Sequence, residues 1–146
     1  MMNEIKITRA KDPKVGLEYA DRYIIEHTQS RYPEVNDFTK EEYSFLAYDG
    51  ADIVGAIFAT TKYDTIYVNK LGVHRDYRRL KIGTQLLQAM EQLANNLQCQ
   101  TITLTTLNYQ ALGFYQKYDY KLYGQIDDNP RRGVTQYLLY KRLAAY

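Results

Sequence analysis

The spacing of apolar residues changes twice along this chain, and each change marks a switch between helix and strand. Up to about residue 30, Leu17, Ala20 and Ile24 recur at intervals of three and four, which predicts a helix that buries them. Between residues 45 and 73 apolar residues alternate with polar ones, which predicts strands. The helical interval returns over residues 82–97. This alternation predicts an α/β fold in which helices cover a mixed sheet.

Turn and cap residues indicate where these elements begin and end. Asp12 followed by Pro13 predicts the start of the first helix, because aspartate caps helices and proline fixes φ at the first position. Asp49-Gly50 predicts a hairpin turn. A helix separates the strands at residues 65–73 and 101–106, so we expect these strands to be parallel neighbours. The expected elements are a strand around Ile5 and Ile7, a helix over 13–30, a loop or short helix over 34–43, strands over 45–48, 53–61 and 65–73, a helix over 82–97, a strand over 101–106, a short helix capped by Asn108, and strands over 119–123 and 134–141.

The composition agrees with a single domain spanning residues 1–146. A chain of 146 residues has about the size of one domain. It contains one cysteine, Cys99, and two histidines, which predicts neither disulfides nor a Cys/His zinc site and indicates a reducing, cytoplasmic location. The formal net charge is only +2, and no apolar run approaches the roughly 20 residues of a membrane span. We therefore expect a soluble, cytoplasmic protein without a metal, a membrane or a nucleic-acid partner.

The junction between the strand at 65–73 and the helix at 82–97 is the most informative segment. This turn carries four cationic side chains: Arg75, Arg78, Arg79 and Lys81. N–H groups at a helix start have no intrahelical partner and the helix dipole adds positive charge there, so the turn suits a phosphate or pyrophosphate. The alternative is a solvated basic turn in which Gly83 only allows close packing of the helix against the strand.

Residues 71–87 also follow the pattern L-x-V-x(4)-R-x-x-G-x-G/A-x-x-L-L, at Leu71, Val73, Arg78, Gly83, Leu86 and Leu87. This pattern resembles the acetyl-CoA-binding motif of the GNAT superfamily of N-acetyltransferases. One position departs, because Lys81 stands where the family usually has its first glycine. If that glycine is needed for positive φ or for close approach of the pyrophosphate, Lys81 weakens binding. If only its N–H matters, Lys81 is tolerated and adds a charge for a CoA phosphate.

A second pattern, N-x-x-A-x-x-F-Y-x-K-x-x-Y, spans residues 108–120. It resembles the second CoA-contacting segment of the family, in which an Asn begins a helix and a Tyr lies near the thioester sulfur. Asp119 replaces a common glycine there. The resemblance continues through the closing strand, turn and strand, and it covers essentially the whole chain. It implies a mixed, mostly antiparallel β-sheet with helices on both faces, in the order β-α-(α)-β-β-β-α-β-α-β-β.

The resemblance implies an enzyme that moves an acetyl group from acetyl-CoA to a primary amine of a small molecule or protein by direct attack. Backbone groups of Leu71 and Val73 would hold the pantetheine and acetyl group, and N–H groups over 79–84 would cradle the pyrophosphate. Tyr115 would be the general acid, because a phenol with an ordinary pKa of about 10 suits protonation of a thiolate. The implied cofactor-binding residues are Leu71, Gly72, Val73, Arg78, Arg79, Leu80, Lys81, Ile82, Gly83, Thr84, Asn108 and Tyr115.

The general base and the acceptor stay open. Residues 65–70, which precede Leu71 on its strand, contain no Glu that could act as the general base. The candidate bases are Asp64, Tyr67, Asn69, Glu41 and Glu42. The segment after the first helix is acidic, with Glu34, Asp37, Glu41 and Glu42. This acidity either suits a cationic amine or is a solvated face. The acceptor is a polyamine, an amino acid, an aminoglycoside-like drug or a protein amino group.

Two other functions compete with the transferase. A CoA-binding or regulatory module without catalysis would explain why Lys81 stands in the position of the family's first glycine and why no general base is evident. A nucleic-acid-binding domain would use the basic turn, although the small net charge disfavours it. The sequence leaves open whether the protein forms a homodimer, for which its 16 tyrosines leave room.

Overall fold

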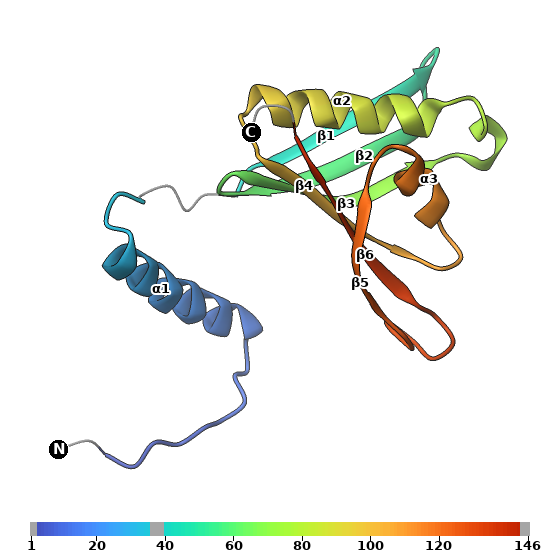
Figure 1. Cartoon of the computed structure of the whole chain (residues 1–146). Helices are drawn as coiled ribbons and strands as arrows, with labels where there is room; N and C mark the ends of the chain where they lie inside the picture. The colour runs from blue at the N-terminus through green and yellow to red at the C-terminus, as the bar shows by residue number, and fades with distance from the viewer. Residues whose placement is uncertain (1–2, 36–39, 144–146) are drawn as a thin grey trace. The chain divides into compact units, whose positions relative to one another are not determined.

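The chain divides into two compact units, residues 1–38 and residues 39–146. In this computed structural model residues 3–35 and 40–143 are described (Figure 1). The described residues form three α-helices, one short 3-10 helix and six strands. None of the helices in these ranges is both long and apolar enough to cross a lipid bilayer.

The regular element of the first unit is helix α1, Pro13–Arg31. It starts where the sequence predicts, because the Asp12 carboxylate accepts a hydrogen bond from the Lys14 N–H at 3.0 Å and proline fills the first helical position. The helix ends before Tyr32, which occupies the C-cap position. The helix predicted over residues 13–30 therefore has both ends within one residue of the observed ones.

Two predictions for the first unit are wrong. Residues 3–10 form no strand around Ile5 and Ile7, because a strand needs a hydrogen-bonded neighbour and the described residues of this unit contain no other strand. The predicted buried residues of α1 are exposed within this unit, where no second element covers the helix: Leu17, Ala20 and Ile24. Of the loop or short helix predicted over 34–43, residues 36–39 lie outside the described residues, and the last two residues already belong to a strand.

The second unit is built on one sheet with the strand order β1-β2-β3-β4-β6-β5. Its strands are β1 (Glu42–Asp49), β2 (Asp52–Lys62), β3 (Thr65–Val73), β4 (Thr101–Leu107), β5 (Lys121–Ile126) and β6 (Gln136–Arg142). Every neighbouring pair is antiparallel except β3 and β4, which are parallel as predicted. The predicted hairpin turn joins β1 to β2, with φ +59° at Gly50. The predicted mixed, mostly antiparallel sheet is thus confirmed.

Helices α2 (Ile82–Asn96) and α3 (Leu112–Lys117) complete the second unit. Helix α2 packs on β1, β2 and β3 (Figure 1). Its apolar face, predicted from the helical interval, is buried in the core at Leu86, Leu87, Met90 and Ala94. Tyr115 of α3 belongs to the same core cluster. This continuous core holds the end of β3, the start of α2 and helix α3 next to one another.

Candidate functional site

Strands β3 and β4 pair over a short stretch and then separate. Their ladder joins Thr65–Val68 to Thr101–Leu104, and the remainder of each strand continues without pairing to the other. A bulge in β3 precedes the separation. The register between β2 and β3 shifts there, so that Asn69 is paired with no residue in the β2 ladder. A bulge bends a strand and increases its twist. Within the described residues, the edge of β3 after Val68 therefore has no strand partner on the β4 side.

The space where β3 and β4 separate belongs to a cleft of about 930 Å³. Its walls are the end of β3, the basic turn, the first turn of α2, the end of β4 and α3. The cationic residues that line it are Lys70, Arg78, Arg79, Lys81 and Lys117. Among the described lining residues there is no aspartate, glutamate or histidine. The cleft therefore favours an anionic ligand.

The backbone at the start of α2 has a geometry that could hold an anion within this cleft. Lys81 has a left-handed backbone, with φ +61° and ψ +21°, and the helix begins at the next residue, Ile82. A left-handed residue followed by a helical one turns consecutive N–H groups into one concavity. The first N–H groups of the helix have no intrahelical partner, and Lys81 makes no side-chain cap hydrogen bond. These donors and the helix dipole together attract negative charge.

Arg78 ties the basic turn to the end of β3. Its Nε donates a hydrogen bond to the carbonyl oxygen of Val73 at 3.3 Å. No ion pair between a lining cation and a carboxylate is found within residues 3–35 and 40–143. The positive charges of the cleft are therefore not neutralised by neighbouring acids. Arg75, which the sequence grouped with them, lies in a 3-10 helix (Arg75–Tyr77) and does not line the cleft.

Tyr115 lines the cleft from α3. It is only 7% exposed, and its ring packs edge-on against Phe114 and Tyr120, with centroids 5.1 and 5.7 Å away. Burial raises the pKa of Tyr115 to about 12, because the phenolate would lose its hydration. The phenol is therefore protonated at physiological pH, and it can donate a hydrogen bond or a proton into the cleft.

Ten of the twelve predicted cofactor-binding residues line the cleft, and the exceptions are Leu80 and Asn108. The prediction that Asn108 caps the short helix is wrong, because the cap position of α3 is Ala111. The turn before α3 is held instead by two other side chains. Thr106 Oγ1 accepts a hydrogen bond from the Ala111 N–H at 3.3 Å, and Gln110 Oε1 accepts one from the backbone N–H three residues earlier at 3.0 Å. These bonds add a turn after β4, so the helix starts later than a cap at residue 108 would require.

The candidate bases do not converge on the cleft. Asn69 alone among them is a lining residue, and its Oδ1 accepts a hydrogen bond from the Thr60 hydroxyl at 3.1 Å. The Tyr67 hydroxyl lies 3.2 Å from the Thr105 hydroxyl, across the point where β3 and β4 separate. Asp37 lies outside the described residues. Within the second unit, the other acidic candidates are not lining residues: Glu41, Glu42 and Asp64. Glu34 belongs to the first unit.

Sequence reasoning missed the glycine that sets the position of α2. A Cβ built on Gly55 of β2 would lie 3.2 Å from Ile82 Cγ2 and 3.2 Å from Leu86 Cδ1, closer than most real Cβ contacts. A Cβ on Gly83 would meet only ordinary contacts, at 3.7 Å from the Phe114 ring. The close packing of helix on strand that the sequence suggested for Gly83 is therefore made at Gly55. A glycine inside a strand pattern was the available signal.

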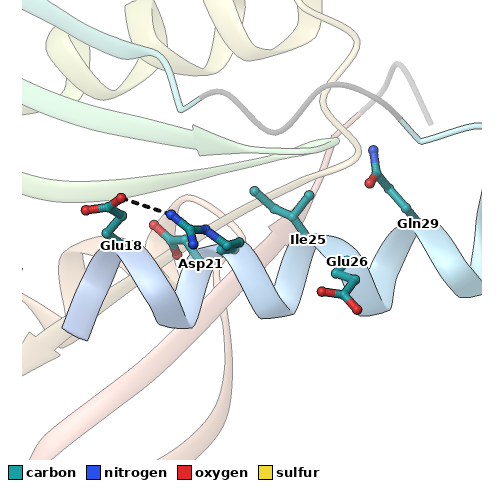
Figure 2. Close-up of a pocket in the computed structure, with 6 residues that line it drawn as sticks. Glu18, Asp21, Ile25, Glu26 and Gln29 are labelled. Atoms are coloured by element: carbon teal, nitrogen blue, oxygen red, sulfur yellow. Dashed lines mark hydrogen bonds and ion pairs between the residues drawn. The ribbon is translucent and has the colours of Figure 1, made fainter. Parts of the chain in front are cut away.

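A second hollow lies along one face of α1 (Figure 2). It measures about 550 Å³ and is lined by Glu18, Asp21, Arg22, Ile25, Glu26 and Gln29. Glu18 and Arg22 form an ion pair at 3.2 Å, one helical turn apart, which is common on exposed helices. One face of one helix does not enclose a ligand as binding pockets do. The cleft of the second unit is therefore the candidate site.

Known proteins are similar to this chain in sequence and in fold. Residues 13–120 match the model of the acetyltransferase (GNAT) family. A blasticidin-S acetyltransferase from Streptomyces morookaense is 30% identical over 101 residues, which are 68% of this chain and 74% of that protein. The 1.9 Å crystal structure of an acetyltransferase from Bacillus cereus ATCC 14579 superposes with a TM-score of 0.80 at 27% identity, over 97% of this chain and 98% of that one. An aminoglycoside 6'-N-acetyltransferase complexed with coenzyme A superposes with a TM-score of 0.63 at 20% identity, over 80% of this chain and 87% of that one, and at this identity the likeness concerns the fold alone.

Proposed function

Because the chain belongs to the acetyltransferase (GNAT) family, we propose that it transfers an acetyl group from acetyl-CoA to a primary amine of a small molecule or protein. The observation that carries this proposal is one cleft that joins the space where β3 and β4 separate to the left-handed turn and first N–H groups at the start of α2. Acetyl-CoA combines a diphosphate, an arm with two amide groups and a thioester. Each part has a matching feature in the cleft.

The described residues fit the charged part of acetyl-CoA at the basic turn. In the proposal the N–H groups over residues 79–84 hold the diphosphate, and the guanidinium and ammonium groups of the cleft neutralise its charge. The pantetheine arm hydrogen-bonds to the backbone of Leu71 and Val73, because the β3 edge has no strand partner there. An extended ligand that adds to an open sheet edge is a recurring mode of recognition. The proposed binding set omits Leu80 and Asn108, which do not line the cleft.

The proposed reaction forms a C–N bond and breaks a C–S bond. The neutral amine nitrogen attacks the thioester carbon, the carbonyl oxygen takes negative charge, and the thiolate then leaves while the nitrogen releases a proton. Tyr115 gives its hydroxyl proton to the sulfur and regains one from solvent. Its raised pKa makes Tyr115 a weaker acid than an ordinary phenol, so we place its proton transfer late, when negative charge has already developed on the sulfur.

The proposed acceptor is an amine that is uncharged when it attacks. The described lining of the cleft contains no carboxylate or imidazole, so the proton of the amine leaves through water in this proposal. The similarity to a protein named as a blasticidin-S acetyltransferase supports small-molecule amines as the first class to try. Amino groups of proteins stay in the proposal as the second class.

A thiol-release assay tests the proposal. The protein is mixed with acetyl-CoA and, in turn, with a polyamine, an amino acid, an aminoglycoside, blasticidin S and a peptide with a free N-terminus. The expected result is release of free CoA that depends on one of these amines, with acetylated product identified by mass spectrometry. Calorimetry with acetyl-CoA runs beside it. No binding of CoA or acetyl-CoA by folded protein would contradict the proposal.

A module that binds CoA without catalysis is the second candidate. Two observations favour it, namely Lys81 at the start of α2 and the lack of a carboxylate in the described lining of the cleft. Such a module would bind acetyl-CoA in calorimetry and release no thiol with any amine of the panel. The two assays together therefore separate the enzyme from the module.

Location and assembly also belong to the proposal. We propose a cytoplasmic protein, on the ground of its single cysteine, Cys99. Size-exclusion chromatography with light scattering decides between a monomer and a homodimer, which the sequence leaves open.

A further inference from the structure

We infer that Tyr118 and Thr84 are positioning residues that fix Tyr115 relative to the start of α2. The Tyr118 hydroxyl on the C-terminal flank of α3 lies 2.8 Å from Thr84 Oγ1 in the first turn of α2. Both side chains line the cleft. This inference rests on the proposed function, because it assigns these residues a part in the acetyl transfer.

Helix α3 depends on side-chain anchors for its orientation. It has only six residues, far fewer than an isolated helix needs for stability in water. On its N-terminal side, the Thr106 hydroxyl accepts a hydrogen bond from the Ala111 N–H at 3.3 Å. On its C-terminal side, the anchor is the bond between Tyr118 and Thr84. Loss of the second anchor would leave the C-terminal end held by packing alone.

The same anchor is joined to Tyr115 by aromatic packing. The ring of Tyr118 packs against Phe114 at 5.3 Å between centroids, and Phe114 packs against Tyr115 at 5.1 Å, both edge-on. Phe114 also faces Gly83, since a Cβ there would lie 3.7 Å from the end of the Phe114 ring. Because aromatic rings in such contact shift together, a displaced Tyr118 moves the ring of Tyr115.

The partner of Tyr118 lies on the element that is proposed to hold the diphosphate. Thr84 is the third residue of α2, and the N–H groups of this first turn have no intrahelical acceptor. A ligand held by these N–H groups would therefore bind the same helical turn that carries Thr84, the residue that orients α3. The hydrogen bond sets the distance between the bound thioester and the Tyr115 hydroxyl, on which proton transfer depends.

Three variants test the inference: Tyr118→Phe, Thr84→Val and the double variant. Each single change removes one hydroxyl of the bond and keeps the shape of the side chain. We expect kcat to fall about fivefold in each single variant, as loss of one neutral hydrogen bond allows, with the Kd of acetyl-CoA changed by less than about twofold. The kcat of the double variant should be no lower than that of either single variant, because both changes remove the same hydrogen bond.

Matched controls make the result specific. Thr84→Ser keeps a hydroxyl and should retain most of kcat, and Tyr123→Phe removes an exposed hydroxyl on β5 and should leave kcat unchanged. Thermal unfolding of every variant identifies a loss of folded protein, and if Tyr118→Phe does not fold, Thr84→Val tests the bond from the other side. Provided that the wild type is active, two results would overturn the inference. One is an unchanged kcat in folded Thr84→Val, and the other is a loss of kcat in the double variant equal to the product of the two single losses. A wild type that binds no acetyl-CoA overturns the proposed function and this inference together.

Discussion

The guanidinium Nε of Arg78 donates a hydrogen bond to the carbonyl oxygen of Val73 at 3.3 Å, and this bond joins the basic turn to the last residue of β3. It uses one of the five N–H donors of the guanidinium. The guanidinium forms no ion pair with a carboxylate within residues 3–35 and 40–143, and its terminal nitrogens can donate to a ligand in the cleft that Arg78 lines. Arg78 thus has two roles in the proposed site, because it holds the turn in place and supplies charge.

We therefore predict that Arg78→Met weakens acetyl-CoA binding by about tenfold, as expected when one charge-assisted hydrogen bond is lost. Methionine keeps most of the apolar stem and removes both the charge and the donors. Calorimetric titration with acetyl-CoA measures the effect. Arg75→Met is the matched control, because Arg75 is near in sequence and does not line the cleft. Equal losses for the two variants would show that general charge, rather than the position of Arg78, determines affinity.

Lys81 combines a left-handed backbone, at φ +61°, with a side chain that lines the cleft. A residue with a Cβ pays about 1 to 2 kcal/mol for this conformation, and asparagine adopts it more readily. We predict that Lys81→Asn raises the free energy of unfolding by up to about 1 kcal/mol and weakens acetyl-CoA binding several-fold. Urea denaturation and calorimetry check the two parts separately. Tighter binding by Lys81→Asn would mean that the lysine opposes the ligand.

The backbone at Lys81 shows what sequence reasoning could and could not supply. The motif placed a non-glycine residue where the family usually has glycine, and the position indeed has positive φ, as does Asp119 at the second such position, with φ +71°. The sequence alone could not tell whether the chain keeps this conformation without glycine. The structure shows that it does at both positions.

Other features followed from local signals or escaped them for physical reasons. The parallel pairing of β3 with β4 was predictable, because a long helix between two strands requires a crossover. Their separation after Val68 was not predictable from the residues, since the bulge at Asn69 depends on tertiary pairing and has no residue signature. The cap at Asn108 was predicted wrongly because the hydroxyl of Thr106 and the amide of Gln110, both upstream of α3, hold the turn instead.

Tyr115→Phe tests the proposed general acid. The ring contacts with Phe114 and Tyr120 survive this change, so the fold and the cleft are retained. We expect kcat to fall about 100-fold, at the lower end of what general acid catalysis contributes, with little change in the Kd of acetyl-CoA. Steady-state kinetics at saturating acetyl-CoA measures kcat. An unchanged kcat would remove Tyr115 from the mechanism.

Alkaline pH should destabilise the fold through buried tyrosines. Burial raises the pKa of Tyr115 to about 12, compared with about 10 in the unfolded chain. Below pH 10 both the folded and the unfolded chain keep the proton, so this group does not lower the free energy of unfolding. Between about pH 10 and 12 the unfolded chain releases the proton while the folded chain retains it, so stability falls, by about 3 kcal/mol for this group alone. Urea denaturation between pH 9 and 11 measures the decline, which should be shallower in Tyr115→Phe, and equal declines would contradict this assignment.

Tyr120 provides an independent test of buried hydroxyls. Burial raises its pKa as well, with further contributions from Glu91 and Tyr115, and its hydroxyl has no hydrogen-bond partner among the described residues. A buried hydroxyl without a partner costs about 1 to 3 kcal/mol. We predict that Tyr120→Phe is at least as stable as the wild type at pH 7, by thermal and urea unfolding. A clear loss of stability would show that the hydroxyl has a partner in solution, such as a buried water.

Gly55 and Gly83 should respond in opposite directions to the same added methyl group. At Gly55 the methyl would meet the side chains of Ile82 and Leu86 at 3.2 Å, so the start of α2 must move away from β2. We expect Gly55→Ala to cost about 1 kcal/mol of stability and to weaken acetyl-CoA binding several-fold, because the N–H groups at the start of α2 shift with the helix.

At Gly83 the methyl meets only ordinary contacts, and alanine is favoured over glycine in a helix by about 0.5 to 1 kcal/mol. We therefore expect Gly83→Ala to unfold at a higher temperature than the wild type. If Gly83→Ala nevertheless binds acetyl-CoA less tightly, its methyl group interferes with the ligand and not with the fold, which would place the ligand against the first turn of α2. If both variants bind as the wild type does, the diphosphate is held elsewhere.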